Sequence, residues 1–307
     1  MNNYDPQFWT MMRREDVDPK VLNIVTAVLD LVPSMPESVQ EIMSMVYDPR
    51  TSSKEIANIA SDDPVLVSSI LRKVNTAYYA LEQKISDINL AIVVLGFNEV
   101  RDLAIQCGLA ARFDLEVDED FNAKQTWGHM YASSICIEQF ADNKRNIHTG
   151  LLMSIGMLHD IGKFALQTVD LHLKRLGVPS GDLSMLERDA PHLQREECLY
   201  GINHAVVGGM LTEKWNLSEN ISTVIEHHHH PSFYPMTEIP EKYRRDVALV
   251  SIADFITNTL IESPTIAPLP DPSYFELLGL PSDTGKLITP ELRQKFKRVN
   301  EFIREIL

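Results

Sequence analysis

The stretch GLLMSIGMLHDIGKFAL, residues 150–166, combines an almost continuous apolar surface with three polar side chains. Its apolar residues would cover every side of a helix, which is typical of a helix buried in the core. His159, Asp160 and Lys163 interrupt the apolar pattern. On a helix these positions lie close together, because residues three or four apart share a face. A buried carboxylate is costly unless it is compensated, so we expect a central helix that points ligand groups at a metal ion.

Other apolar segments of the chain carry further imidazoles and a second carboxylate. Asp254 lies in VALVSIADFITNTLI, where a lone carboxylate needs the same explanation as Asp160. Imidazole and carboxylate ligands suit zinc, iron, manganese or nickel, and the absence of nearby cysteine argues against a closed structural zinc site. Four further helices are expected to supply the remaining ligands, which are His129, His204, His227, His228 and Asp254.

The composition is that of an acidic globular protein. The chain has 307 residues and a formal net charge of −15, which disfavours binding to nucleic acid or to an anionic membrane surface. Its three cysteines have no paired spacing, and no apolar run is long enough to cross a bilayer. The first residues do not form a signal peptide. We therefore expect a cytoplasmic protein that binds neither nucleic acid nor membrane.

Helix signals dominate the chain and predict an all-α fold, a helical bundle in two parts. Candidate helix starts include a capping box at Ser34 with Glu37, another at Ser52 with Glu55, and Asp63 followed by proline. An acidic segment at 113–120 is a plausible boundary between the two parts. The expected divisions are an N-terminal extension at 1–19, a helical module at 20–112, a metal-binding helical domain at 121–262, and a loop with a C-terminal helix at 263–307.

Several motifs, taken together, are specific to one family. The first half contains SDDP at 61–64, VNTAYY at 74–79 and AIVVLGFNEVR at 91–101. The second half contains MLHDIGK at 157–163, GINHAVVGG at 201–209 and IEHHH at 225–229. Over about residues 25–262 the chain resembles the HDOD domain, an all-helical relative of the HD phosphohydrolases found in bacterial signalling proteins.

The resemblance also implies roles for the candidate ligands. The chain is similar to metal-dependent HD enzymes, including the HD-GYP cyclic-di-GMP phosphodiesterases, which implies two divalent metal ions. Asp160 would bridge the ions, and Lys163 would contact a phosphate oxygen. One metal site would be completed by His129, His159 and Asp254, and the other by His204, His227 and His228.

Some features of the chain favour other interpretations. Gln125 stands where HD-GYP enzymes often have a glutamate ligand, and the HD-GYP loop after the paired histidines is replaced by HHHHPSFYP. Lys163 could equally form a salt bridge to Asp160 one turn away. The polar cluster could also be a relic of the family, held by hydrogen bonds alone. We expect His229 and His230 to be solvent-facing loop residues.

Two functions from different classes follow from these observations, and the family resemblance together with the missing HD-GYP loop favours the first. The first is a signal-transduction protein that retains a metal centre and acts through a signalling protein partner. The second is a metal-dependent phosphohydrolase or phosphodiesterase with a phosphate-containing small-molecule ligand, such as a nucleotide or cyclic dinucleotide. In the second case Asp160 and Lys163 would be the catalytic residues, with Lys163 offsetting charge that develops on the phosphate.

Overall fold

The structure is a computed structural model that describes residues 9–306, apart from 47, 49, 82, 111–112, 114–121, 142–148, 178–180, 182, 184–185, 187–189 and 262–267. The expected acidic boundary at 113–120 therefore lies almost wholly outside the described residues. Within the described ranges all regular structure is helical and no strand occurs. The α-helices are α1 (Pro19–Leu29), α2 (Glu37–Met45), α3 (Ser53–Ser61), α4 (Pro64–Val74), α5 (Ile88–Leu95), α6 (Phe97–Ala110), α7 (Ala123–Phe140), α8 (Thr149–Gly156), α9 (Ile161–Arg175), α10 (His192–Tyr200), α11 (His204–Lys214), α12 (Glu219–His227), α13 (Arg244–Ile261), α14 (Pro272–Leu278) and α15 (Pro290–Ile306). The 3-10 helices are η2 (Arg14–Asp16), η3 (Ala77–Tyr79), η4 (His230–Ser232), η5 (Met236–Glu238), η6 (Glu241–Tyr243) and η7 (Thr284–Lys286).

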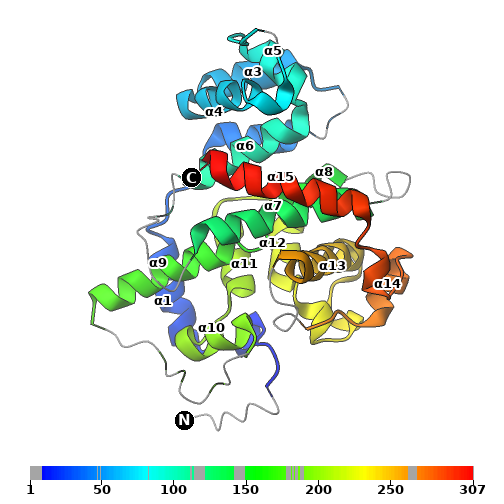
Figure 1. Ribbon diagram of the computed structural model, residues 1–307. Coiled ribbons are helices and arrows are strands. Elements are labelled where there is room, and N and C mark those ends of the chain that lie inside the picture. Colours follow the sequence, from blue (N-terminus) through cyan, green and yellow to red (C-terminus); the bar gives the residue numbers. More distant parts are fainter. Residues whose placement is uncertain are drawn as a thin grey trace.

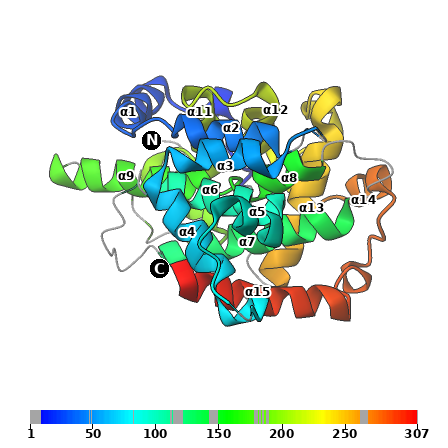
Figure 2. The same ribbon diagram turned by 90° about the horizontal axis from the view of Figure 1, so that it is seen from above.

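The helices form two groups stacked on each other (Figure 1). Helices α2–α6 form the upper group, and α6 contacts α8 of the lower group. The lower group is built around α7, α9, α11 and α13, with α11 packed on both α9 and α12. Seen from above, α1 and α15 lie at opposite edges of the molecule (Figure 2). The expected all-α bundle in two parts is confirmed.

Short polar residues set many of the helix starts. Asp63 accepts hydrogen bonds from two backbone amides of α4, and proline occupies the first helical position, as expected. Ser52 and Glu55 form the expected capping box of α3. The expected cap at Ser34 is wrong, because α2 begins at Glu37 after Pro36 and has no side-chain cap.

The expected continuous helix over 150–166 is interrupted. Helix α8 ends at Gly156, residues 157–160 form turns, and α9 begins at Ile161. A Cβ on Gly156 would lie 3.0 Å from the Cα of Ser134 in α7, whereas one on Gly162 would lie 1.9 Å from the carbonyl oxygen of His204. The two halves therefore pack closely against different helices, α7 and α11. The turn between them carries the His-Asp pair.

Two terminal regions add to the lower group. Helix α1 packs against α9 and α11, although the sequence pattern joined it to the module at 20–112. Helix α15 packs along α7, and Thr289 caps its first turn by accepting a hydrogen bond from the amide of Leu292. The region before α15 was expected to be a loop but contains α14. Among the described residues, no helix is both long enough and apolar enough to cross a membrane.

Candidate metal centre

Several segments of the lower group bring imidazoles and carboxylates to one point. The ligands come from α7, the turn before α9, the start of α11, the two residues that follow α12, and α13. The ligand atoms form two groups, and within each group they all lie within 4.8 Å of one another. The first ligand group consists of His129, His159 and Asp254, and the second ligand group consists of Asp160, His204, His228 and His229.

The first ligand group is fully internal. His129 Nε2 lies 2.8 Å from Oδ1 of Asp254 and 3.2 Å from Nε2 of His159. Asn258, one turn along α13, donates a 2.9 Å hydrogen bond to the same oxygen of Asp254. The three ligand residues are at most 5% exposed. Their donor atoms therefore converge on a space shielded from solvent.

Asp160 lies between the two groups and offers one oxygen to each. Its Oδ2 lies 3.6 Å from Nε2 of His129 and 3.7 Å from Nε2 of His159. Its Oδ1 lies 3.0 Å from Nε2 of His204 and 3.9 Å from Nε2 of His228. This is the position that a bridging ligand requires.

The hydrogen bonds of the imidazole Nδ1 atoms turn the Nε2 atoms toward this centre. His159 Nδ1 donates to the carbonyl oxygen of Gly156 at 2.8 Å, and His228 Nδ1 donates to that of Ile225 at 2.6 Å. A carbonyl oxygen can only accept, so Nδ1 carries the proton in both rings. His204 Nδ1 lies 2.7 Å from a carboxylate oxygen of Glu196. Such partners are typical of metal-ligating histidines.

The atom that best tests the fit to a metal ion is Nε2 of His228. It is buried and has no hydrogen-bond partner among the described residues. Burial lowers the pKa of His228 to about 3, so the ring is neutral at pH 7 and Nε2 holds a free lone pair. A buried lone pair aimed at a carboxylate and two imidazoles is explained if a cation binds between them. The donor set thus fits a divalent metal ion.

The two carboxylates carry negative charge that suits a cation site, whereas His204 has to lose a proton before it can bind a metal ion. Burial would raise the pKa of Asp160, but Lys163 and neighbouring histidines hold it well below its usual value. Asp254 is likewise held low, against burial, by hydrogen bonds and charge from His129 and His159. Burial would lower the pKa of His204, but Glu196 and Asp160 raise it to about 9. Both carboxylates are therefore ionised at neutral pH.

The structure differs from the sequence interpretation within the run of four histidines. His229, expected in solvent, belongs to the second ligand group, with Nε2 3.0 Å from Nε2 of His204. His227, expected as a ligand, lies outside both groups; its Nδ1 donates to Thr223 and its ring packs on His230. His230 is buried and not solvent-facing. The core face of α12, which includes Ile221, Val224 and Ile225, continues to His228 at helical spacing and passes His227 by.

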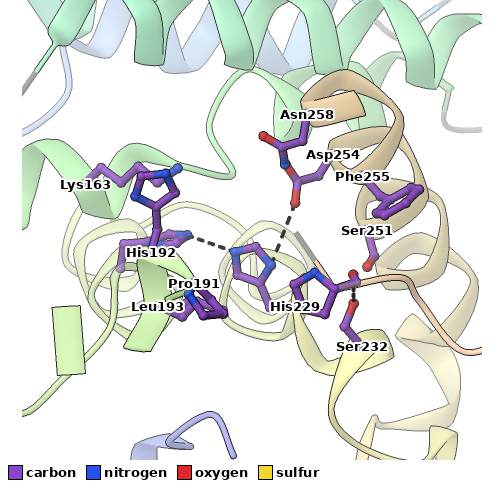
Figure 3. Close-up of a pocket in the computed structure, with 12 residues that line it drawn as sticks. Lys163, Pro191, His192, Leu193, His229, Ser232, Ser251, Asp254, Phe255 and Asn258 are labelled. Carbon is purple, nitrogen blue, oxygen red and sulfur yellow. Dashed lines mark hydrogen bonds and ion pairs between the residues drawn. The ribbon is translucent and has the colours of Figure 1, made fainter. Parts of the chain in front are cut away.

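A pocket opens beside the ligand groups (Figure 3). The empty space within it, open solvent included, is about 550 Å³. The figure shows His229 between Lys163 and His192 on one side and Ser251 and Phe255 on the other. Its lining residues are Lys163, Pro191, His192, Leu193, His204, His229, Ser232, Ser251, Asp254, Phe255, Asn258 and Pro268. The pocket thus touches members of both ligand groups.

Lys163 lies at the junction of the pocket and the ligand groups. Its Nζ is 2.6 Å from Oδ2 of Asp160, so the salt bridge considered from the sequence is present. Its side chain is also 26% exposed and lines the pocket. Burial would lower its pKa, but Asp160 and Glu196 raise it above the usual value, so the ammonium is charged. The salt bridge and a contact with a pocket ligand are therefore compatible.

Sequence reasoning missed several residues that support the ligands. Glu196 accepts hydrogen bonds from His204, and Asn258 donates to Asp254. Asn203 caps α11 directly before His204. An asparagine before a helical segment is a recognisable capping signal, whereas nothing in the local pattern around Glu196 marks its contact across eight residues.

Fold and site together define an all-helical protein with a buried cluster of histidines and aspartates. The sequence profile of the HDOD domain matches residues 32–231, and the chain belongs to that family. The resemblance seen in the sequence motifs is thereby confirmed.

Comparisons with individual proteins agree with this assignment. An uncharacterized protein of Treponema pallidum is 23% identical over 231 residues, which cover 74% of this chain and 42% of that protein. This chain therefore spans less than half the length of that curated relative.

Solved structures share the fold at low sequence identity. A proposed signal transduction protein of Marinobacter aquaeolei has a TM-score of 0.73 at 16% identity, covering 98% of this chain and 68% of its own. An HDOD domain protein of unknown function from Geobacter sulfurreducens has a TM-score of 0.66 at 20% identity, with coverages of 94% and 98%. A proposed metal-dependent phosphohydrolase of Shewanella amazonensis has a TM-score of 0.59 at 14% identity, with coverages of 94% and 98%.

Proposed function

We propose that this protein is a metal-dependent phosphohydrolase that cleaves a small phosphate ester, such as a nucleotide or cyclic dinucleotide. The observation that carries the proposal is the pocket that reaches both ligand groups beside the charged amine of Lys163. A partner-binding protein with a vestigial centre has no need of such an opening. A hydrolase needs its metal ions, a cation for the phosphate and access for substrate at one place.

The proposed centre holds two divalent ions, one in each ligand group, with Asp160 between them. Iron, manganese, zinc and nickel all accept imidazole and carboxylate ligands. When bound, such ions would activate water and neutralise charge on phosphoryl oxygens. The name of the Shewanella amazonensis neighbour, a proposed metal-dependent phosphohydrolase, supports this chemistry as an analogy.

Residues of the chain supply the other requirements of phosphate-ester cleavage. Lys163 would bind a phosphoryl oxygen while Asp160 keeps its amine fixed at 2.6 Å. Phe255 would pack against an apolar or aromatic part of the substrate, and Ser251 and Asn258 offer hydrogen bonds in the same pocket.

The test combines metal analysis with an activity screen. Purified protein, loaded separately with Mn²⁺, Fe²⁺, Zn²⁺ and Ni²⁺, would be assayed on phosphomonoesters, nucleotides and cyclic dinucleotides. Asp160→Ala should be inactive, and Asp170→Ala should remain active, since Asp170 is a buried carboxylate of α9 that pairs with Lys174 outside the site. Absence of bound metal in the wild-type protein, or activity that survives Asp160→Ala, would contradict the proposal.

A second candidate function is signal transduction through a protein partner. Leu90 and Val93, one turn apart on α5 of the upper group, are 49% and 59% exposed. Large apolar side chains at such positions suit a partner protein. The Marinobacter aquaeolei neighbour, a proposed signal transduction protein, supports this candidate as an analogy. A double Leu90→Ser, Val93→Ser variant should lose the partner in co-purification while keeping bound metal and hydrolysis.

A further inference from the structure

Residues 9–14, here called the N-terminal strap, run over the lower group beside α10 (Figure 1). Residues 9–13 have no regular secondary structure, and Arg14 begins η2. Met11 is fully buried, and the ring of Trp9 packs edge-on against Phe233 at 5.2 Å between centroids. Arg14 forms ion pairs with Glu213 of α11 and Glu226 of α12. The strap is therefore docked by apolar burial at its centre and by charge at its end.

One buried carboxylate receives the strap. Glu197 of α10 accepts hydrogen bonds at 2.7 Å from the indole nitrogen of Trp9, from the backbone amide of Met12 and from the side chain of Asn203. Glu197 is only 8% exposed, so these three donors replace the water that a carboxylate would otherwise bind. Release of the strap would remove two of them.

Asn203 joins the strap to the start of α11. Its amide nitrogen donates to Glu197 and to the carbonyl oxygen of Met12, at 2.7 and 2.9 Å. Its side-chain oxygen accepts a 3.1 Å hydrogen bond from the amide of Val206, which caps α11. The residue is fully buried and precedes the ligand His204 directly. The strap, α10 and the helix start are thus joined through one side chain.

Glu196, the neighbour of Glu197 in α10, contacts the metal-ligand candidate His204 directly. Glu196 accepts hydrogen bonds from the backbone amide of His204 at 2.8 Å and from its Nδ1 at 2.7 Å. The two adjacent carboxylates of α10 therefore divide their contacts: Glu196 holds the ligand, and Glu197 holds the strap and Asn203. A shift of this turn of α10 would disturb both sets of contacts together.

We propose that strap docking and metal binding in the second ligand group are coupled through Glu196 and Glu197, which act as positioning residues. The docked strap keeps α10 in the position where Glu196 orients His204, and bound metal in turn keeps the strap docked. This inference rests on the proposed metal centre and adds a means of control to it. Any event that draws the strap away would weaken the hold on metal at the substrate pocket.

The coupling is reciprocal by thermodynamic necessity, and this gives it two independent readouts. The first is the affinity for Zn²⁺, measured by competition with a chromophoric chelator. The second is the rate of trypsin cleavage after Arg13 and Arg14, followed by mass spectrometry of the released peptide. Cleavage requires the strap to leave its binding surface, so its rate reports the undocked fraction.

The main variant is Glu197→Gln, which keeps the side-chain size but places an amide group against hydrogen-bond donors. We expect Zn²⁺ affinity of the second ligand group to fall about tenfold, as when a charged hydrogen bond is lost, and cleavage after Arg13 and Arg14 to accelerate by a similar factor. In the wild-type protein, saturating Zn²⁺ should slow that cleavage. Trp9→Phe is the milder second variant, because it keeps the ring against Phe233 and removes only the indole donor.

Glu219→Gln is the matched control, since Glu219 pairs with Lys242 at an exposed site away from the strap. It should change neither readout. Circular dichroism would verify that each variant is folded. If Glu197→Gln does not fold, the two readouts of Trp9→Phe test the coupling instead. The coupling would be overturned if a folded variant has unchanged Zn²⁺ affinity and if Zn²⁺ does not change the rate of trypsin cleavage. This result would not contradict the proposed metal centre. A wild-type protein that binds no Zn²⁺ at all would overturn both.

Discussion

The two ligand groups share their chemistry but differ in their access to solvent. The residues of the first ligand group are buried, and of them only Asp254 borders the pocket. The second ligand group borders it through His204 and His229, and the side chain of His229 is 17% exposed. Under the proposed function, the first group would retain an ion and the second group would contact the substrate.

The two groups also differ in the backbone that carries them. Two of the three members of the first ligand group, His129 and Asp254, lie within long helices, α7 and α13, and the third, His159, lies in the turn before α9. His204 is the first residue of α11, and His228 and His229 follow the last residue of α12. Helix ends depend on caps and local contacts. The second ligand group should therefore respond more readily to changes elsewhere in the molecule.

The strongest test of the comparison is Asp160→Ala, because Asp160 offers one oxygen to each group. We expect both ions to be lost and the melting temperature to fall. The variant also leaves Lys163 without its partner, and breaking a buried ion pair costs about 3 kcal/mol or more. Elemental analysis and thermal denaturation measure the two effects.

Asp170→Ala, on the helix that follows Asp160, is the control for this variant. It removes a buried carboxylate that pairs with Lys174 at 2.6 Å, so it should lower stability and keep the metal. An Asp160→Ala protein that still contains both ions would mean that the groups do not share this residue.

A smaller effect, confined to one group, separates the histidines at the end of α12. His229→Ala should remove the ion of the second ligand group and leave that of the first. His227→Ala should leave both ions in place, because His227 lies outside the ligand atoms and contacts Thr223 and His230. Metal content per chain measures the difference. If His227→Ala loses an ion and His229→Ala does not, then His227 and His228 are the ligands, as predicted from the sequence.

Much of this architecture follows from the sequence. Charged residues in apolar segments identified Asp160 and Asp254, and capping residues located the starts of α3 and α4. The remainder depends on tertiary contacts that periodicity does not encode. The helix expected over 150–166 is interrupted between Gly156 and Gly162, which pack closely against different helices, α7 and α11. His229 reaches the centre only because the backbone leaves α12 and turns into η4.

Lys163→Gln tests whether the pocket beside the second ligand group binds the substrate. The variant should keep both ions, since Lys163 belongs to neither ligand group. Its kcat/KM should fall about 100-fold, the usual cost of removing one group that stabilises charge in the transition state. Lys174→Gln, which breaks the comparable pair on α9, is the matched control and should leave activity unchanged. Equal activities of the two variants would reduce Lys163 to a structural salt bridge.

The smallest expected effect is a proton released when metal binds the second ligand group. The pKa of His204 is raised to about 9 against the cost of burial, by Glu196 and Asp160, so the ring is protonated at pH 7 and must lose that proton to become a ligand. Affinity should therefore rise with pH up to about 9, by roughly tenfold per unit, and then level off. His228, with its pKa lowered to about 3 by burial, releases no proton.

Calorimetric titration of the His129→Ala variant with Zn²⁺, in buffers of different ionisation enthalpy, measures the number of protons released while only the second ligand group is complete. Glu196→Gln should reduce the number of protons released at pH 7, because the Glu196 carboxylate contributes most to raising the pKa of His204. An unchanged number would assign the released proton to another residue.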